Sequence, residues 1–167
     1  QSLLPDNGLR KIDGIDLQLH RVKAVLEYLD NPQDKVPAIH VAGTNGKGSV
    51  CAYLAHILHS AGYRAGRYLS PHMLEPRDAI HFEDGLPPTQ AEYEATSAHT
   101  DNVIRELLTT RRLDETHTEF EKATISAFQL FASRKLDFTI VEVGLGGRFD
   151  ATNVFAKPAI TIITSIG

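Results

Sequence analysis

Two hydrophobic patterns take turns along this chain: short continuous apolar runs, and longer stretches in which apolar residues recur every three or four positions. Continuous runs of about four to eight residues are typical of buried strands, and the wider spacing is typical of amphipathic helices. Strands are expected at residues 38–42, 63–69, 137–144 and 159–166. Because helix-like stretches separate them, the pattern predicts βαβ units and an α/β fold with a mostly parallel sheet flanked by helices.

Helices are expected in four places. The first is residues 15–29, where apolar residues keep helical spacing before a proline-containing connector: Ile15, Leu19, Val22, Leu26 and Leu29. The second runs from Ser49 to a C-terminal Gly62, with Val50, Leu54, Ile57 and Leu58 on its apolar face. The last two open with capping boxes, Thr89-x-x-Glu92 and Thr118-x-x-Glu121. A proline-rich loop with a small hairpin is expected at residues 70–88.

Composition narrows the class of protein. A chain of 167 residues is about the size of one domain. Its net charge is −4 and its basic residues form no run longer than Arg111-Arg112, so we expect no nucleic-acid partner. The single cysteine, Cys51, excludes an internal disulfide and is expected to be a small packed residue. No apolar run approaches the roughly 18 residues of a membrane span, and no signal peptide is evident, so a soluble cytoplasmic protein is expected.

The most informative stretch is Gly43-Thr44-Asn45-Gly46-Lys47-Gly48-Ser49, between an apolar strand and a helix. Glycines let backbone N–H groups converge on a phosphate, and a helix N-terminus adds its positive dipole end. Lys47 is placed to reach outer phosphates and Ser49 to ligate Mg²⁺. The strict phosphate-loop pattern fails, because Gly48 separates the lysine from the serine. The alternative is a glycine-rich turn without a ligand.

Glu142 is the candidate metal-orienting carboxylate. It ends a run of β-branched residues, and ligands of α/β sheets lie beyond the carboxyl ends of strands. A carboxylate in so apolar a run is costly to bury unless it is paired or holds a metal. The alternative is a glutamate on an edge strand that faces water.

The loop after that strand, "GLGGRFDATN" at residues 144–153, combines three glycines with Arg148, Asp150 and Asn153. Glycines permit close backbone approach to a ligand, and the polar groups could orient it. The alternative is an ordinary irregular connection. His56 and His59 lie one helical turn apart, but without a third ligand nearby we interpret them as a solvated pair.

Four segments together resemble one family. "HVAGTNGKGSV", "SPHM" followed by "EPRDAI", "TEFEKATISAFQLF" and "VEVGLGGRFDATN", in this order, resemble the ATP-binding domain of the folylpolyglutamate synthase and dihydrofolate synthase family, within the Mur-type ligases. The likeness covers about residues 15–167 and leans towards fungal dihydrofolate synthases. It also accounts for the unusual phosphate loop, since "GTNGKG[ST]" is this family's own form of it. The departure is "MLEPRDAI", where the family more often has a leucine after the histidine and an Arg-Ile pair.

The resemblance implies a reaction: ATP phosphorylates a pteroate or folate carboxylate, and the amine of L-glutamate attacks the acyl phosphate. It implies ATP and Mg²⁺ as cofactors, dihydropteroate or folate and L-glutamate as substrates, and a monomer. By residue, Lys47 and Glu142 carry the chemistry, Ser49 and Glu142 hold the metal, and Gly43 to Val50 bind ATP. The substrate side is expected to include Ser70, Pro71, His72, Arg77, Glu121, Arg148, Asp150 and Asn153.

The resemblance also predicts how the chain is divided and which parts of the family's fold it lacks. Residues 1–36 are expected to form an N-terminal helix and connector, and residues 37–167 a partial ATP-binding domain of a P-loop type. The family's second metal ligand and its C-terminal domain are not in this sequence, so the chain is expected to be truncated and inactive alone. In a eukaryote a mitochondrial location is also open. The alternatives are another Mur-type ligase, a P-loop kinase, or a nucleotide-binding module without chemistry.

Overall fold

A five-stranded sheet forms the centre of the protein, seen here in a computed structural model that describes residues 11–12, 15–16, 18–72 and 74–167. The strand order is β5-β4-β6-β3-β7, and only the β4–β5 pair is antiparallel. The strands are β3 (Ala38–Ala42), β4 (Ala65–Tyr68), β5 (Ile80–His81), β6 (Phe138–Glu142) and β7 (Ile160–Ile163). The predicted mostly parallel α/β sheet is therefore confirmed.

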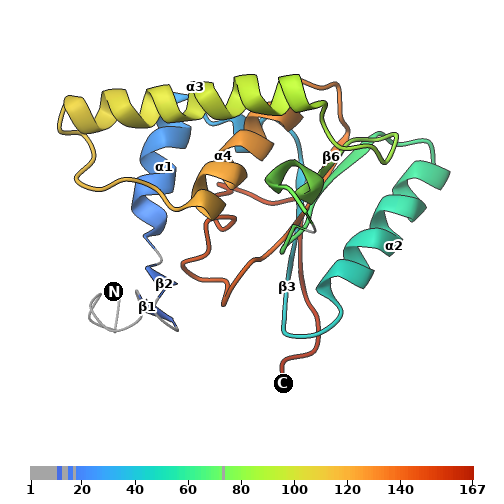
Figure 1. Ribbon diagram of the computed structural model, residues 1–167. Coiled ribbons are helices and arrows are strands. Elements are labelled where there is room, and N and C mark those ends of the chain that lie inside the picture. The colour runs from blue at the N-terminus through green and yellow to red at the C-terminus, as the bar shows by residue number, and fades with distance from the viewer. Residues whose placement is uncertain (1–10, 13–14, 17, 73) are drawn as a thin grey trace.

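Helices cover both faces of this sheet (Figure 1). Three lie on one face: α1 (Leu19–Tyr28), α3 (Gln90–Thr109) and α4 (Glu119–Ala132). The other face carries α2 (Lys47–Ser60), which packs over a smaller apolar cluster. The larger core lies under α4, where Phe128 and Phe131 are almost fully buried, as the spacing of α4 predicts. Two 3₁₀ helices complete the elements, η1 (Pro32–Asp34) and η2 (Pro76–Ala79).

Both capping boxes form where they were predicted. Thr89 and Thr118 each accept a hydrogen bond from the backbone N–H three residues on, and the glutamates Glu92 and Glu121 accept from the threonine N–H groups in return. These bonds satisfy donors that have no partner within the helix. The starts of α3 and α4 were therefore readable from sequence.

Two predicted helix starts and one predicted hairpin are wrong. The first helix begins at Leu19, because Ile15–Asp16 forms a short strand, β2, that pairs with β1 (Lys11–Ile12). Helix α2 begins at Lys47 rather than Ser49, and Ile57 is 61% exposed instead of facing the core. The hairpin expected within residues 70–88 is a turn, closed by the Phe82 N–H donating to the Leu86 carbonyl, and β5 pairs with β4 instead.

Parts of the expected N-terminal region and of "SPHM" lie outside the described residues, namely residues 1–10, 13–14, 17 and 73.

Strand β7 forms one edge of the sheet and pairs on one side with β3. Near this edge three large apolar side chains are strongly exposed: Ile160 at 51%, Ile163 at 69% and Ile166 at 78%. Cys51, by contrast, lies on the inner face of α2 and is fully buried, as predicted, and burial raises the pKa of its thiol to about 12. No helix in the described part of the chain has the length and apolarity needed to cross a membrane.

Candidate active site

The carboxyl ends of the four parallel strands meet at one edge of the sheet. Strand β3 leads into the glycine loop, β4 into Ser70, β6 ends at Glu142 and β7 leads into Thr164. In Figure 1 the loop between β3 and α2 lies beside the C-terminal residues of the chain. This edge is the usual ligand site of a parallel sheet, because loops from adjacent strands converge there.

The glycine loop is tied to the segment after β7. The N–H groups of Thr44 and Asn45 donate to the Ser165 carbonyl, at 2.9 and 3.4 Å. Gly43 has φ +130°, and a Cβ there would lie 2.0 Å from Thr164 Oγ1. Only glycine fits that position, because a side chain would be both strained and in collision. Gly46, at φ +85°, then caps α2 so that the helix axis starts at Lys47. The loop is a strand-to-helix cradle of the kind that binds phosphate.

Lys47 and Glu142 face each other across this cradle. Lys47 Nζ donates to the carbonyls of Gly43 and Thr44, at 3.0 and 3.4 Å, and lies 4.0 Å from Glu142 Oε1. Glu142 is 5% exposed on a central strand, so the interpretation as a water-facing edge residue is excluded. Burial raises the pKa of its carboxyl, partly offset by the Ser70 N–H, which donates at 3.4 Å, and by Lys47. A buried carboxylate so sparsely bonded is suited to bind a cation.

The residues present fit magnesium in particular. Within the described residues, no three His, Cys, Asp or Glu side chains come together as a metal site, and His56 and His59 are exposed, as expected for a solvated pair. Magnesium differs from zinc in that it keeps several waters and takes one or two carboxylates plus substrate phosphates. Glu142 with the exposed Ser49 at the first turn of α2 supplies such a partial set.

A large apolar pocket opens on the other side of Glu142. Its volume is about 720 Å³, which suits a ligand with an extended ring system. Ser70, which donates to Glu142, is part of its wall, so the pocket adjoins the glycine cradle. The other lining residues come mainly from β4 and its loop, the first turn of α4 and the loop after β6: Tyr68, Leu69, Pro71, His72, Pro76, Ala79, Thr118, Glu119, Phe120, Glu121, Ala123, Gly144, Leu145, Asp150 and Ala151.

Five of the predicted substrate-side residues therefore line one pocket: Ser70, Pro71, His72, Glu121 and Asp150. The other three do not. Arg77 donates to Glu75 and to the Pro88 carbonyl. Arg148 is exposed above the Phe149 ring, and Asn153 donates to the Arg148 carbonyl at 3.0 Å. Their predicted substrate contacts remain predictions.

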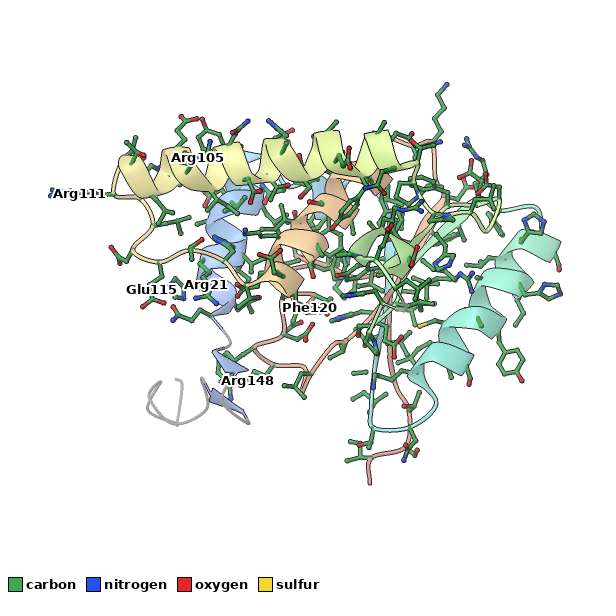
Figure 2. The ribbon with its side chains drawn as sticks, viewed as in Figure 1. Arg21, Arg105, Arg111, Glu115, Phe120 and Arg148 are labelled. Carbon is green, nitrogen blue, oxygen red and sulfur yellow. The ribbon has the colours of Figure 1, made fainter. Side chains whose placement is uncertain are left out.

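The carboxylates of Glu121 and Asp150 already accept hydrogen bonds from other groups of the protein. Glu121 accepts from Arg21 Nε at 2.9 and 3.0 Å and from the Thr118 N–H at 2.7 Å. Figure 2 shows Arg21 on α1 and Phe120 on the first turn of α4. Asp150 accepts from the N–H groups of Leu145 and Thr152. Both carboxylates are buried, and both shape the pocket wall through these bonds.

Sequence reasoning missed the aromatic wall of the pocket. Tyr68 and Phe120 stack at a centroid distance of 6.3 Å, and the Tyr68 hydroxyl hydrogen-bonds Thr124 Oγ1 at 3.1 Å. The helical spacing of Phe120, Phe128 and Phe131 by itself indicates only a core-facing stripe. The available signal was the place of Phe120 two residues after the capping-box Thr118, because the first turn of a helix often borders a site.

Comparison with known proteins agrees with this geometry, although no family model matches the chain. A probable dihydrofolate synthetase of Schizosaccharomyces pombe is 42% identical over 152 residues, 91% of this chain and 35% of that protein. The structure of Mycobacterium tuberculosis folylpolyglutamate synthase complexed with ADP and AMPPCP superimposes with a TM-score of 0.83, at 36% identity, covering 90% of this chain and 34% of that one. A bifunctional folylpolyglutamate synthase/dihydrofolate synthase with Mn, AMPPNP and L-glutamate bound gives 0.80 at 42% identity, over 91% and 35%.

The chain is a homologue of dihydrofolate synthases and folylpolyglutamate synthases. It spans about a third of the length of the relatives it matches. The predicted resemblance, drawn from four short segments, is thus confirmed at the level of sequence and of fold.

Gly144 of this synthase homologue offers a test of the pocket. A Cβ at residue 144 would lie 2.5 Å from Phe120 Cζ and 3.1 Å from Asp150 Oδ2. In the full-length protein, Gly144→Ala is expected to displace the Phe120 ring and lower the Tm by about 2 °C or more, because overpacking forces neighbouring side chains to shift. Thermal unfolding measures this, and an unchanged Tm would contradict the close packing of residue 144 against the pocket wall.

Proposed function

We propose that the protein containing this chain ligates L-glutamate to a pteroate or folate carboxylate at the expense of ATP. The observation that carries the proposal is the shared border of two sites at one sheet edge. Glu142 faces Lys47 of the glycine cradle and also accepts from Ser70, which lines the 720 Å³ apolar pocket. A nucleotide and a flat aromatic acid can therefore meet at Glu142. The relatives' bound ADP, AMPPCP, AMPPNP, Mn and L-glutamate support this assignment.

The cradle provides positioning and charge neutralisation, which are the main needs of phosphoryl transfer. The loop 43–48 would hold the β- and γ-phosphates through its N–H groups and the N-terminus of α2, and Lys47 would turn from its own loop carbonyls to the phosphate oxygens. Ser49 and Glu142 would hold Mg²⁺, which lowers the charge on the phosphates when bound.

The acceptor carboxylate is a poor electrophile until one of its oxygens becomes part of a better leaving group. The γ-phosphoryl group is transferred to that oxygen, and ADP leaves. The glutamate amine then attacks the carboxyl carbon, an amide bond forms, and inorganic phosphate leaves with the oxygen. The pocket walls contribute by excluding water from the acyl phosphate, since Tyr68 and Phe120 cover that side.

We assign the ring system of the acceptor to the apolar pocket. The partly exposed Phe120 ring offers a stacking face, and the buried Tyr68 ring packs against it. Ser70, Pro71 and His72 form the rim nearest Glu142. Residues 37–167 are proposed as the ATP-binding unit, with α1 packed on α3 and α4 as its N-terminal support.

The 167-residue chain by itself is expected to show no glutamate-dependent ADP release. It carries a phosphate cradle and one metal-ligating carboxylate, but spans only about a third of the relatives' length. A coupled assay of ADP formation with ATP, glutamate and acceptor measures this. Turnover at the rate of the full-length protein would contradict it.

The deciding experiment is ATP turnover by the full-length protein with L-glutamate and either dihydropteroate or tetrahydrofolate. Glutamate-dependent phosphate release with one or both acceptors is expected. If neither acceptor supports release, the folate assignment fails, and another Mur-type acid–amino-acid ligase becomes the better reading of the same cradle.

A further inference from the structure

A buried chain of hydrogen bonds joins β3 to the loop after β6. His40 Nε2 lies 2.9 Å from Thr152 Oγ1, and that hydroxyl donates to Asp150 Oδ1 at 2.5 Å. The other carboxylate oxygen, Oδ2, accepts from the Leu145 N–H at 2.7 Å. Thr152 and Asp150 are fully buried, and His40 is 9% exposed. Four groups from two segments more than 100 residues apart are thus linked in series.

The proton positions along this chain follow from its chemistry. An ionised carboxylate only accepts, so the single Thr152 proton must point at Asp150. The Thr152 oxygen therefore accepts from His40, and His40 carries its proton on Nε2. Burial lowers the pKa of His40, which agrees with a neutral ring. Each donor in the series has one acceptor, and the hydrogen bonds converge on the Asp150 carboxylate from both ends.

The two ends of this hydrogen-bonded series lie at the two halves of the site. His40 precedes Gly43 of the glycine cradle by three residues on β3. At the other end, Gly144, Leu145, Asp150 and Ala151 form the floor of the apolar pocket. The His40 ring is also held edge-on against Phe155, which packs against Phe128 of the core, each pair at 5.4 Å between ring centroids. The loop is thereby fastened to an interior strand of the sheet.

We propose that His40 and Thr152 are positioning residues that hold, through Asp150, the pocket floor in the shape that binds the acceptor. Neither residue lines the pocket itself. The identity of the acceptor rests on the proposed function, whereas the fastening of the loop does not. Asp150 lines the pocket, and its carboxylate also orients Leu145 and Thr152.

Thr152→Val tests this in the full-length protein, because valine keeps the shape and removes the hydroxyl. The acceptor KM is expected to rise about tenfold, with the KM for ATP and kcat within about threefold of wild type. Thr152→Ser, which keeps the hydroxyl, should restore most of the affinity. The matched control is Thr100→Val, a fully buried threonine whose hydroxyl bonds Ser126 Oγ between α3 and α4, away from the pocket. Equal acceptor KM values for the Thr152→Val and Thr100→Val proteins would overturn the proposal.

Hydrogen exchange supplies a reading that does not depend on activity. In the Thr152→Val protein, amides of residues 144–153 should exchange at least about tenfold faster than in wild type, whereas Thr100→Val should leave them unchanged. If Thr152→Val does not fold, His40→Leu and His40→Gln replace it, with glutamine retaining a donor and expected to protect the loop better. Unchanged exchange in the variant lacking the donor or hydroxyl refutes the positioning role. Absence of turnover by the wild type with every acceptor refutes only the proposed function.

Discussion

Replacing Lys47 with alanine in the full-length protein is expected to lower the rate of the proposed ATP-dependent glutamate ligation about 100- to 1,000-fold. The reason is its position, since Nζ lies over the glycine loop, bonded to the Gly43 and Thr44 carbonyls, and 4.0 Å from Glu142. No other lysine or arginine of the described residues is hydrogen-bonded to this loop, so no neighbouring cation replaces it. Charge neutralisation of the transferred phosphate is then lost.

The Lys47→Ala effect should appear in kcat and in the KM for ATP, with the acceptor KM little changed. Lys35→Ala is the matched control, because its ion pair with Asp30 is exposed and lies at the opposite end of β3. An activity of the Lys47 variant within about threefold of the Lys35 variant would remove Lys47 from the site. Loss of ADP release together with intact nucleotide affinity would instead place it in the chemical step alone.

Glu142→Gln is expected to raise the thermal stability of the protein while lowering its ligation rate about 100-fold or more. Glutamine has nearly the shape of glutamate but cannot supply the charge that holds a magnesium ion. It also removes a buried charge that the fold stabilises poorly, since burial raises the carboxyl pKa. With EDTA and without nucleotide, the Tm at pH 7.5 should exceed that of wild type by about 2 °C or more.

The pH dependence of that stability gain has a definite sign. A raised carboxyl pKa means that the folded state holds the proton more tightly than the unfolded state does. The contribution of Glu142 to the stability of wild type therefore falls as pH rises from the ordinary glutamate value of 4.5 through the raised pKa of Glu142. The Tm difference between Glu142→Gln and wild type should be small near pH 4 and grow towards pH 7.5. In the control Glu83→Gln the gain should be absent, because the Arg64 hydrogen bond lowers the pKa of Glu83. A lower Tm for Glu142→Gln at pH 7.5 would contradict the account.

Local chemistry made much of the fold predictable. The capping boxes at Thr89 and Thr118 placed two helix starts, because both partners of each bond lie within one turn of sequence. The run ending in Glu142 predicted a buried central strand, because a strand covered on both faces has no polar side. The cradle was also predictable, because the residues that form it, Gly43 to Ser49, are contiguous in sequence.

The rest depends on residues far apart in sequence. Ile15 fits a helical spacing, yet its backbone pairs with Ile12, and periodicity carries no information about such a partner. Glu121 lines the pocket, but the partner of its carboxylate, Arg21, lies 100 residues away in sequence. The pocket wall combines Tyr68 with Phe120, which only the folded sheet and α4 bring together.

The bare edge of β7 bears on how the 167-residue chain behaves in solution. Among the described residues no strand pairs with its outer side, and Ile160, Ile163 and Ile166 offer apolar area to a strand that pairs there. Edge-to-edge pairing between copies of this chain is therefore expected to grow with concentration. The oligomeric state measured on this chain alone would therefore report self-association through β7. The expectation of a monomer is to be tested on the full-length protein.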